Sequence, residues 1–257
     1  MSEALRQLAE DVAREAGDGL RTAFGRLSEL QVSTKSSPSD WVSEADTQTE
    51  ELIRARLDAA RPDDAILGEE GDDKPGTTGL RWVVDPLDGT VNFLFGIPIW
   101  AVSVAVEDAD GVLAGVVYDP MADELWSAAR DGDPAMNGAP VRSPVRADLG
   151  TALVATGFGY DSAVRERQAA VVARLLPQVR DVRRLGSAAL DLAWLAAGRY
   201  DAYYEFGINH WDVAAGALIC ERAGLAVHHF PADPPAGPGM VAGAAALVEA
   251  LVPILTD

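Results

Sequence analysis

The chain has 257 residues, 48% of them hydrophobic, which is enough to bury a sizeable core in one large domain or two closely packed subdomains. Its formal net charge of −19 repels nucleic-acid phosphates and anionic membrane surfaces, so neither is an expected partner. A single cysteine, Cys220, excludes an intrachain disulfide and a thiolate metal site, and no apolar run is long enough to span a bilayer, so we expect a cytoplasmic protein.

Helices come first in the predicted order of elements. Apolar residues recur every three or four positions over residues 3–28, which predicts an amphipathic helix. A polar loop that contains Lys35 precedes a second predicted helix, which runs from Ser43 to about Ala59. Ser43 and Asp46 resemble a capping box with Asp in the usual Glu position, which is a structural alternative for Asp46. Strands are then predicted at residues 65–67, 82–84, 101–106, 112–118, 124–129 and 138–142, with a hairpin turn at 108–111.

From residue 150 onward, strands and helices alternate. The predicted strands are 152–156, 182–185, 200–204 and 225–230, and the predicted helices are 162–176, 187–197 and 212–223. A largely antiparallel first half followed by such alternation predicts a mixed α/β fold. We place an N-terminal α+β subdomain at residues 1–145 and a C-terminal α/β subdomain at residues 146–257.

Two aspartates leave the end of a short apolar strand in the middle of the first half. Asp85 and Asp88 are separated by Pro86, which removes a backbone donor and turns the chain, so that carbonyl oxygens can face the same space as the carboxylates. Gly89 allows a ligand close to the backbone, and Thr90 adds a hydroxyl and an N–H. This pattern suits a hard divalent cation bound to a phosphate. Asp-Gly between apolar runs also fits a hairpin, although the proline disfavours one outside an edge strand.

Other carboxylates occupy similar places in the chain. Glu69 follows a predicted strand, Glu205 ends another, and Asp212 stands at the start of a predicted helix. A purely structural role as the N-cap of that helix is the alternative for Asp212. With Asp85 and Asp88, Glu69 and Asp212 make four oxygen donors that suit Mg²⁺ or Mn²⁺. If they converge, they would hold two or more cations for an in-line phosphoryl displacement. The three histidines lack the spacing of a zinc hydrolase.

Residues 68–70, 85–93 and 211–216 together resemble the three signatures of the inositol monophosphatase family, which are Mg²⁺-dependent, lithium-sensitive phosphatases. The resemblance implies a layered αβαβα sandwich of the inositol monophosphatase and fructose-1,6-bisphosphatase type, two or three Mg²⁺ ions that Mn²⁺ can replace, and a homodimer. The implied metal ligands are Glu69, Asp85, the carbonyl of Leu87, Asp88 and Asp212. The implied water-activating residues are Asp46, Glu69 and Thr90. The implied substrate contacts are Leu87, Asp88, Gly89 and Thr90 for the phosphate and Gly186, Ser187, Ala188 and Glu205 for the remainder, with Lys35 as a candidate supporting residue behind them.

We therefore predict hydrolysis of inositol-1-phosphate to inositol and phosphate by metal-activated water. Histidinol phosphate, fructose-1,6-bisphosphate and 3′(2′),5′-bisphosphate nucleotides are alternative substrates, because the Pro- and Ala-rich segment 228–239 departs from the strand pair usual in relatives. Aspartyl-phosphate phosphatases need one residue between the two aspartates, and here there are two. A non-catalytic phosphate- or metal-binding protein is the third alternative, but it would not need water-activating groups.

Overall fold

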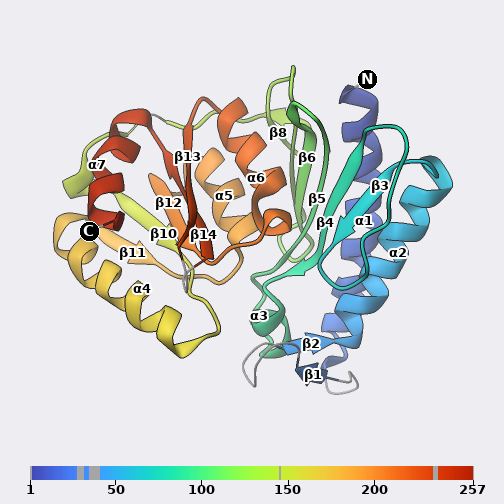
Figure 1. Ribbon diagram of the computed structural model, residues 1–257, viewed down its shortest axis with the longest axis horizontal. Helices are drawn as coiled ribbons and strands as arrows, with labels where there is room; N and C mark the ends of the chain where they lie inside the picture. The colour runs from blue at the N-terminus through green and yellow to red at the C-terminus, as the bar shows by residue number, and fades with distance from the viewer. Residues whose placement is uncertain (1, 28–31, 35–40, 145, 234–236, 257) are drawn as a thin grey trace.

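The chain folds into five layers in which helices and β-sheets alternate (Figure 1). The structure, a computed structural model, describes residues 2–27, 32–34, 41–144, 146–233 and 237–256. Across the molecule, the layers are a helix pair, a seven-stranded sheet, a second helix pair, a five-stranded sheet and a third helix pair. The predicted αβαβα sandwich is confirmed.

Helices α1 (Ser2–Phe24) and α2 (Glu44–Ala60) cover the outer face of the larger sheet. The apolar stripe predicted from the sequence is the buried side of α1, where it includes Leu5, Val12 and Leu20. At Gly17 the helix crosses the sheet so closely that a Cβ atom would lie 2.5 Å from the ring of Tyr118. Both predicted helices are confirmed, although α1 ends earlier than expected.

The larger sheet is antiparallel except at one edge. Its strands follow each other in sequence order: β3 (Ala65–Gly68), β4 (Arg81–Asp88), β5 (Ala101–Asp108), β6 (Gly111–Asp119), β7 (Glu124–Ala129), β8 (Ala135–Met136) and β9 (Ala139–Pro140). Only β3 and β4 are parallel, and the predicted hairpin joins β5 to β6. The single strand predicted at 138–142 is wrong. Asn137 and Gly138 have φ of 48° and 77° and form the turn between β8 and β9, because Asn-Gly favours such turns.

Helices α5 (Ala188–Ala196) and α6 (His210–Arg222) fill the space between the two sheets. Because a sheet lies on either side, α5 is buried almost all round, as its Ala- and Leu-rich sequence requires. The larger sheet uses strands before residue 145 and the smaller sheet strands after it. Since both sheets share the middle helices, the division into subdomains 1–145 and 146–257 stays a prediction.

The smaller sheet is mixed, with the order β11 (Asp181–Arg183), β10 (Leu153–Thr156), β12 (Ala202–Phe206), β14 (Gly237–Gly243) and β13 (Ala226–Asp233). Strands β11, β10 and β12 are parallel, and β12, β14 and β13 are antiparallel. The expectation that segment 228–239 lacks a strand pair is wrong, because Phe230 pairs with Gly239 across it. Pro231 is tolerated because it lies at a register shift on the edge strand. Helices α4 (Ser162–Leu175) and α7 (Ala245–Thr256) cover the outer face.

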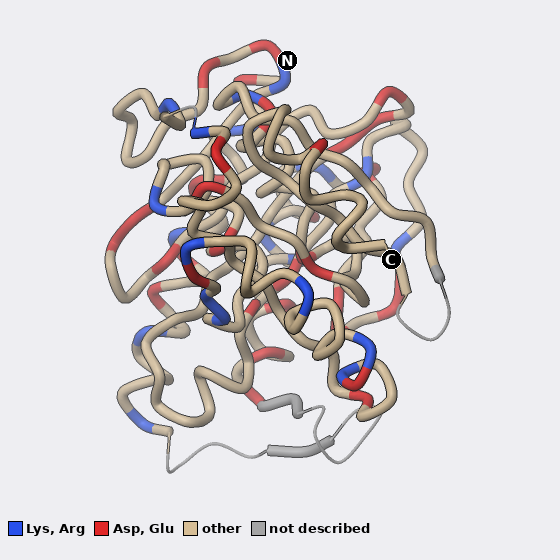
Figure 2. Tube along the Cα trace, turned by 90° about the vertical axis from the view of Figure 1, so that its left-hand side faces the viewer, with Lys and Arg blue, Asp and Glu red and all other residues tan. Residues whose placement is uncertain are grey.

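Several short elements complete the description. Strands β1 (Val32–Thr34) and β2 (Trp41–Ser43) pair with each other, and α3 (Thr90–Leu94) follows β4. Acidic residues occur along the whole trace rather than in one run (Figure 2). Among the helices described, none is both long and apolar enough to cross a membrane.

Candidate active site

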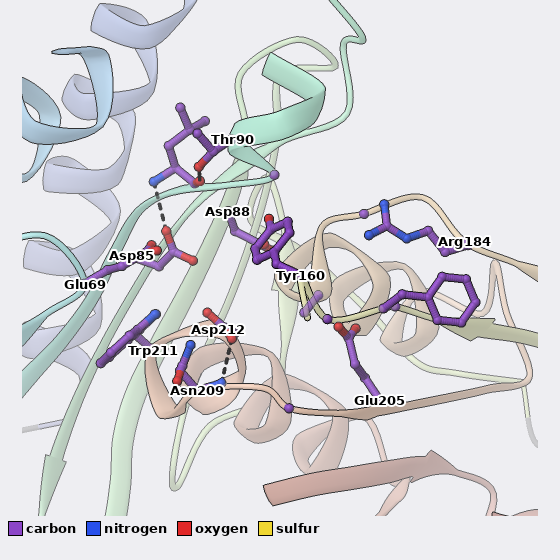
Figure 3. A pocket seen from close by; sticks show the side chains of 18 residues that line it. Glu69, Asp85, Asp88, Thr90, Tyr160, Arg184, Glu205, Asn209, Trp211 and Asp212 are labelled. Carbon is purple, nitrogen blue, oxygen red and sulfur yellow. Dashed lines mark hydrogen bonds between the residues drawn. The ribbon is translucent and has the colours of Figure 1, made fainter. Parts of the chain in front are cut away.

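A cavity of about 300 Å³ is lined by strand ends of both sheets and by the starts of α5 and α6 (Figure 3). Such crevices at the carboxyl ends of strands are common ligand sites. In Figure 3, Glu69, Asp85 and Asp212 lie toward one end of the cavity and Glu205 toward the other. Carboxylates that are far apart in the sequence therefore line the same cavity.

The end of β4 is shaped by a bulge rather than by a hairpin. Asp85 pairs with Ser103 and Asp88 with Ala101, so one extra residue is accommodated around Pro86. Gly89 has φ of 100° and leads directly into α3, and a Cβ there would lie 3.0 Å from a backbone carbonyl oxygen. The hairpin alternative is therefore wrong.

Hydrogen bonds fix one oxygen of each of three carboxylates. The backbone N–H of Leu87 donates to Asp85 Oδ1 over 2.9 Å, and that of Asn209 donates to Asp212 Oδ2 over 2.7 Å. Asp88 Oδ2 accepts from the start of α5, namely from the Ser187 hydroxyl at 2.7 Å and the Ala189 N–H at 2.6 Å. Asp212 is thus not the N-cap of α6, which is Asn209. Its carboxylate helps to fix the helix start and also lines the cavity.

Asp46, in the first turn of α2, is completely buried next to Thr90. The Thr90 hydroxyl lies 2.8 Å from Asp46 Oδ1 and 3.1 Å from the Leu87 carbonyl oxygen. Both neighbours are acceptors, so the hydroxyl proton points toward one of them and the Thr90 oxygen keeps its lone pairs for another donor. The pair can therefore hold a water molecule at the cavity wall.

Comparisons with known proteins decide the family. The sequence profile of the inositol monophosphatase family matches residues 1–253. The chain belongs to the inositol monophosphatase family. It is 44% identical over 273 residues to the inositol-1-monophosphatase SuhB of Mycobacterium tuberculosis, covering 98% of this chain and 91% of that protein. The solved extragenic suppressor protein suhB of Bartonella henselae superposes with a TM-score of 0.91 at 36% identity, covering 99% of each chain.

A second relative carries a different name. The Nus factor SuhB of Pseudomonas aeruginosa is 40% identical over 229 residues, covering 87% of this chain and 84% of that protein. The family and the mycobacterial relatives at 44% identity are named for inositol monophosphatase activity, so this member of the inositol monophosphatase family is a phosphatase. The family is generally metal-dependent.

The carboxyl groups in this site of an inositol monophosphatase family member are buried and lie close enough to repel each other. Burial, followed by the charges of Glu69 and Asp88, raises the pKa of Asp85 well above its ordinary value. Burial also raises the pKa of Asp88 to about 6, against the opposing hydrogen bonds from α5. The pKa of Asp212 is raised by burial and then by the charge of Asp88, and burial raises the pKa of Glu205 to about 7. Cations in the cavity would relieve this mutual repulsion.

The donor atoms fit a hard divalent cation. Carboxylate and carbonyl oxygens are the ligands that Mg²⁺ prefers, and here they carry an excess of negative charge. Within the described part of the chain, however, no three His, Cys, Asp or Glu side chains form an assembled metal site. The structure therefore brings the predicted ligands into one cavity without closing them around a single point.

Most residues predicted for the site line this cavity. They are Glu69, Asp85, Leu87, Asp88, Gly89, Thr90, Gly186, Ala188, Glu205 and Asp212. Asp46 and Ser187 are buried directly behind the wall, where they contact Thr90 and Asp88. Lys35 lies outside the described residues. The catalytic, metal-binding and substrate-binding roles of all these residues stay predictions.

Part of the cavity wall was not predicted from the sequence. The additional lining residues are Gly157, Phe158, Gly159, Tyr160, Arg184, Gly207, Asn209 and Trp211. A signal existed for residues 157–160, because glycine and aromatic residues alternate immediately after a predicted strand. Arg184, whose guanidinium carbon lies 5.9 Å from the centre of the Phe158 ring, gave no comparable signal.

Proposed function

We propose that the chain is a Mg²⁺-dependent phosphomonoesterase that hydrolyses inositol-1-phosphate to inositol and phosphate. The observation that supports this is a single cavity with the carboxylates of Glu69 and Asp85 toward one end and a hydrogen-bond acceptor for hydroxyl groups, Glu205, toward the other. In this reaction a water oxygen bonds to phosphorus, the bond from phosphorus to the inositol oxygen breaks, and the leaving oxygen takes a proton.

In this proposal, Glu69, Asp85, the Leu87 carbonyl, Asp88 and Asp212 would hold two or three Mg²⁺ ions, which Mn²⁺ can replace. Bound Mg²⁺ supplies the positive charge that activates water and stabilises the leaving oxygen. The hydrogen bonds to Asp85, Asp88 and Asp212 fix the carboxylates before any ligand arrives.

The positions of the other residues support the remaining roles in this proposal. Thr90, oriented by buried Asp46, accepts a hydrogen bond from the attacking water, and Glu69 lies on the same side of the cavity. Residues 87–90 contact the phosphate, and residues 186–188 together with Glu205 contact the inositol. Lys35 stays a prediction as a supporting residue.

The decisive experiment measures phosphate release by the purified protein with Mg²⁺ and with a chelator. The esters are inositol-1-phosphate, histidinol phosphate, fructose-1,6-bisphosphate and adenosine 3′,5′-bisphosphate. We expect Mg²⁺-dependent release with a preference for inositol-1-phosphate, and a preference for another ester would reassign the substrate.

Asp88→Asn tests the mechanism, because it removes a charge while keeping the acceptor for the start of α5. We expect kcat to fall about 10²-fold or more, as when a group that stabilises transition-state charge is removed. Retention of most of the activity would contradict the assigned role. A phosphoenzyme trapped by rapid quench would instead favour an aspartyl-phosphate mechanism.

A second candidate is a binding role without catalysis, favoured by the relative that is named Nus factor SuhB. Absence of release from every ester, with metal binding intact, would support that role. We also propose a cytoplasmic homodimer whose activity is inhibited by lithium, and Mg²⁺ titrations with added Li⁺ test the last point.

A further inference from the structure

Gly157 and Glu205 lie next to each other at the ends of the neighbouring parallel strands β10 and β12. Gly157 follows β10 and Glu205 is near the end of β12, where Thr156 pairs with Tyr204. The carboxylate of Glu205 lies so close over Gly157 that a Cβ atom there would overlap Cδ and both oxygens. Gly157 is not among the glycines with positive φ, so space rather than backbone conformation requires a residue without a side chain.

Tyr203 forms a hydrogen bond with the same carboxylate. Its hydroxyl donates to Glu205 Oε2 over 2.9 Å, and the side chain is fully buried, so the donor is fixed by packing. Residues two apart in a strand point to the same face, which brings the two side chains together. This bond uses Oε2 and leaves Oε1 to accept a hydrogen bond from a ligand hydroxyl in the cavity.

We propose that Gly157 and Tyr203 are positioning residues that seat Glu205 for the hydroxyl groups of the substrate and so set the preference for polyol phosphates. The inference rests on the proposed function, in which Glu205 contacts the alcohol part of the ester. A site built to hydrogen-bond a hydroxyl rejects analogues that lack it, because its polar group is then left unpaired. Glu69 and Asp85, two of the predicted metal ligands, lie toward the other end of the cavity, so Glu205 is assigned to selection of the ester rather than to its hydrolysis.

Gly157→Ala is the principal variant. The atoms that a new Cβ would meet belong to the end of a flexible side chain, so Glu205 moves aside and the fold is kept. We expect KM for inositol-1-phosphate to rise about 10-fold or more, while kcat and KM for phenyl phosphate, which has no hydroxyl group, change less than about 2-fold. Tyr203→Phe keeps the buried ring and should raise KM for inositol-1-phosphate about 3- to 10-fold.

A double-mutant cycle separates positioning from damage to the fold. In a Glu205→Ala background, Gly157→Ala has no carboxylate to displace, so it should leave KM unchanged within about 2-fold. Gly150→Ala is the matched control, since its Cβ would meet nothing closer than Asp148 Oδ1 at 3.8 Å, outside the cavity. This control should leave kcat and KM for both esters unchanged.

Two results would overturn the inference: equal loss of activity on both esters in Gly157→Ala, or an undiminished effect of that substitution when Glu205 is already alanine. Failure of the proposed function is seen in the wild type alone. A wild type that prefers another hydroxyl-bearing ester contradicts inositol-1-phosphate as substrate, and the variants are then scored on that ester. A wild type that favours no hydroxyl-bearing ester over phenyl phosphate overturns both proposals.

Discussion

Asp64 shows what a buried carboxylate looks like when its surroundings supply donors instead of other carboxylates. Its oxygens accept hydrogen bonds from Arg61 at 2.8 and 3.1 Å, from the Thr78 hydroxyl at 2.6 Å and from the Trp82 indole at 3.0 Å. Burial alone would raise the pKa of Asp64, but these donors outweigh it and lower the pKa. The pKa values of the cavity carboxylates shift in the opposite direction because burial, and after it the charges of neighbouring carboxylates, is not offset by comparable donors.

The lowered pKa of Asp64 predicts how the stability of the fold depends on pH. A carboxyl whose pKa is lower in the folded than in the unfolded chain stabilises the fold above its ordinary pKa of about 3.9, and this contribution is lost as pH falls through the folded value. Asp64→Asn should therefore lower the free energy of unfolding by about 1–3 kcal/mol at pH 7, with the cost shrinking below about pH 4. Urea unfolding between pH 7 and about 3 measures this. Asp63→Asn, at an exposed neighbour, is the control, and a cost that is independent of pH would show that the charge of Asp64 is not its source.

At the scale of elements, α1 contains two glycines with opposite surroundings. A Cβ at Gly17 would meet the Tyr118 ring at 2.5 Å and Pro120 Cγ at 2.7 Å, whereas a Cβ at Gly19 would meet nothing within 4 Å. Gly17→Ala should destabilise the protein by about 1–3 kcal/mol through overpacking. Gly19→Ala should stabilise it by about 0.4–1 kcal/mol, because alanine is favoured in a helix interior. Denaturant midpoints of the two variants test the pair, and shifts of the same sign would contradict the close crossing of α1 over β6.

Elements that depend on local pattern could be predicted from the sequence, and the others could not. The apolar periodicity that predicts α1 and the Asp-Gly pair that predicts the turn between β5 and β6 each lie within the local sequence of the element they predict. Helix α3 is only five residues long and follows the left-handed Gly89, which the sequence equally allowed in a hairpin. Strand β14 is rich in glycine and owes its form to pairing with both β12 and β13. Helix α7 contains Pro253, which speaks against a helix when the sequence is considered alone.

The same distinction applies to the site. Glu69 directly follows β3 and Asp88 ends β4, so both could be proposed as ligands in advance. Asp85 lies inside β4, because this strand continues to Asp88 instead of ending at residue 84 as predicted. The hydrogen-bond partners of Asp88 come from the start of α5, and Ala189 is 101 residues away in the sequence. No local sequence pattern predicts such a contact. The close contact between the Glu205 carboxylate and Gly157 likewise forms only when β10 and β12 pair.

For the whole molecule, the predicted cations would link the two halves of the chain. Asp85 and Asp88 belong to the larger sheet and Asp212 to the middle layer, so bound Mg²⁺ should stabilise the complete fold. At a concentration about 100-fold above Kd, the gain would be about 2.7 kcal/mol. We expect Tm to rise with Mg²⁺ and the rise to be smaller in Asp212→Asn. NaCl at equal ionic strength is the control, and an equal rise with NaCl would mean that Mg²⁺ only screens the net charge.

The net charge also bears on the predicted homodimer. Two exposed apolar side chains follow α3, Phe95 at 64% and Ile97 at 43% exposure, and they are candidates for the contact. Two copies that each carry a charge of −19 repel, and the Debye length falls from about 30 Å at 0.01 M salt to about 8 Å at 0.15 M, so association should strengthen with salt. Light scattering at 0.15 M NaCl should give about twice the 27.1 kDa chain mass.

Ile97→Ser should weaken that dimer and shift the salt dependence to higher concentrations, because it removes apolar surface from the contact without adding charge. Met121→Ser is the matched control, since Met121 is also exposed, at 38%, but lies on the turn between β6 and β7. Light scattering across a salt series measures both variants. A wild type that keeps the mass of one chain at every salt concentration would contradict the homodimer. If Ile97→Ser dimerises as well as Met121→Ser, the contact lies on another face.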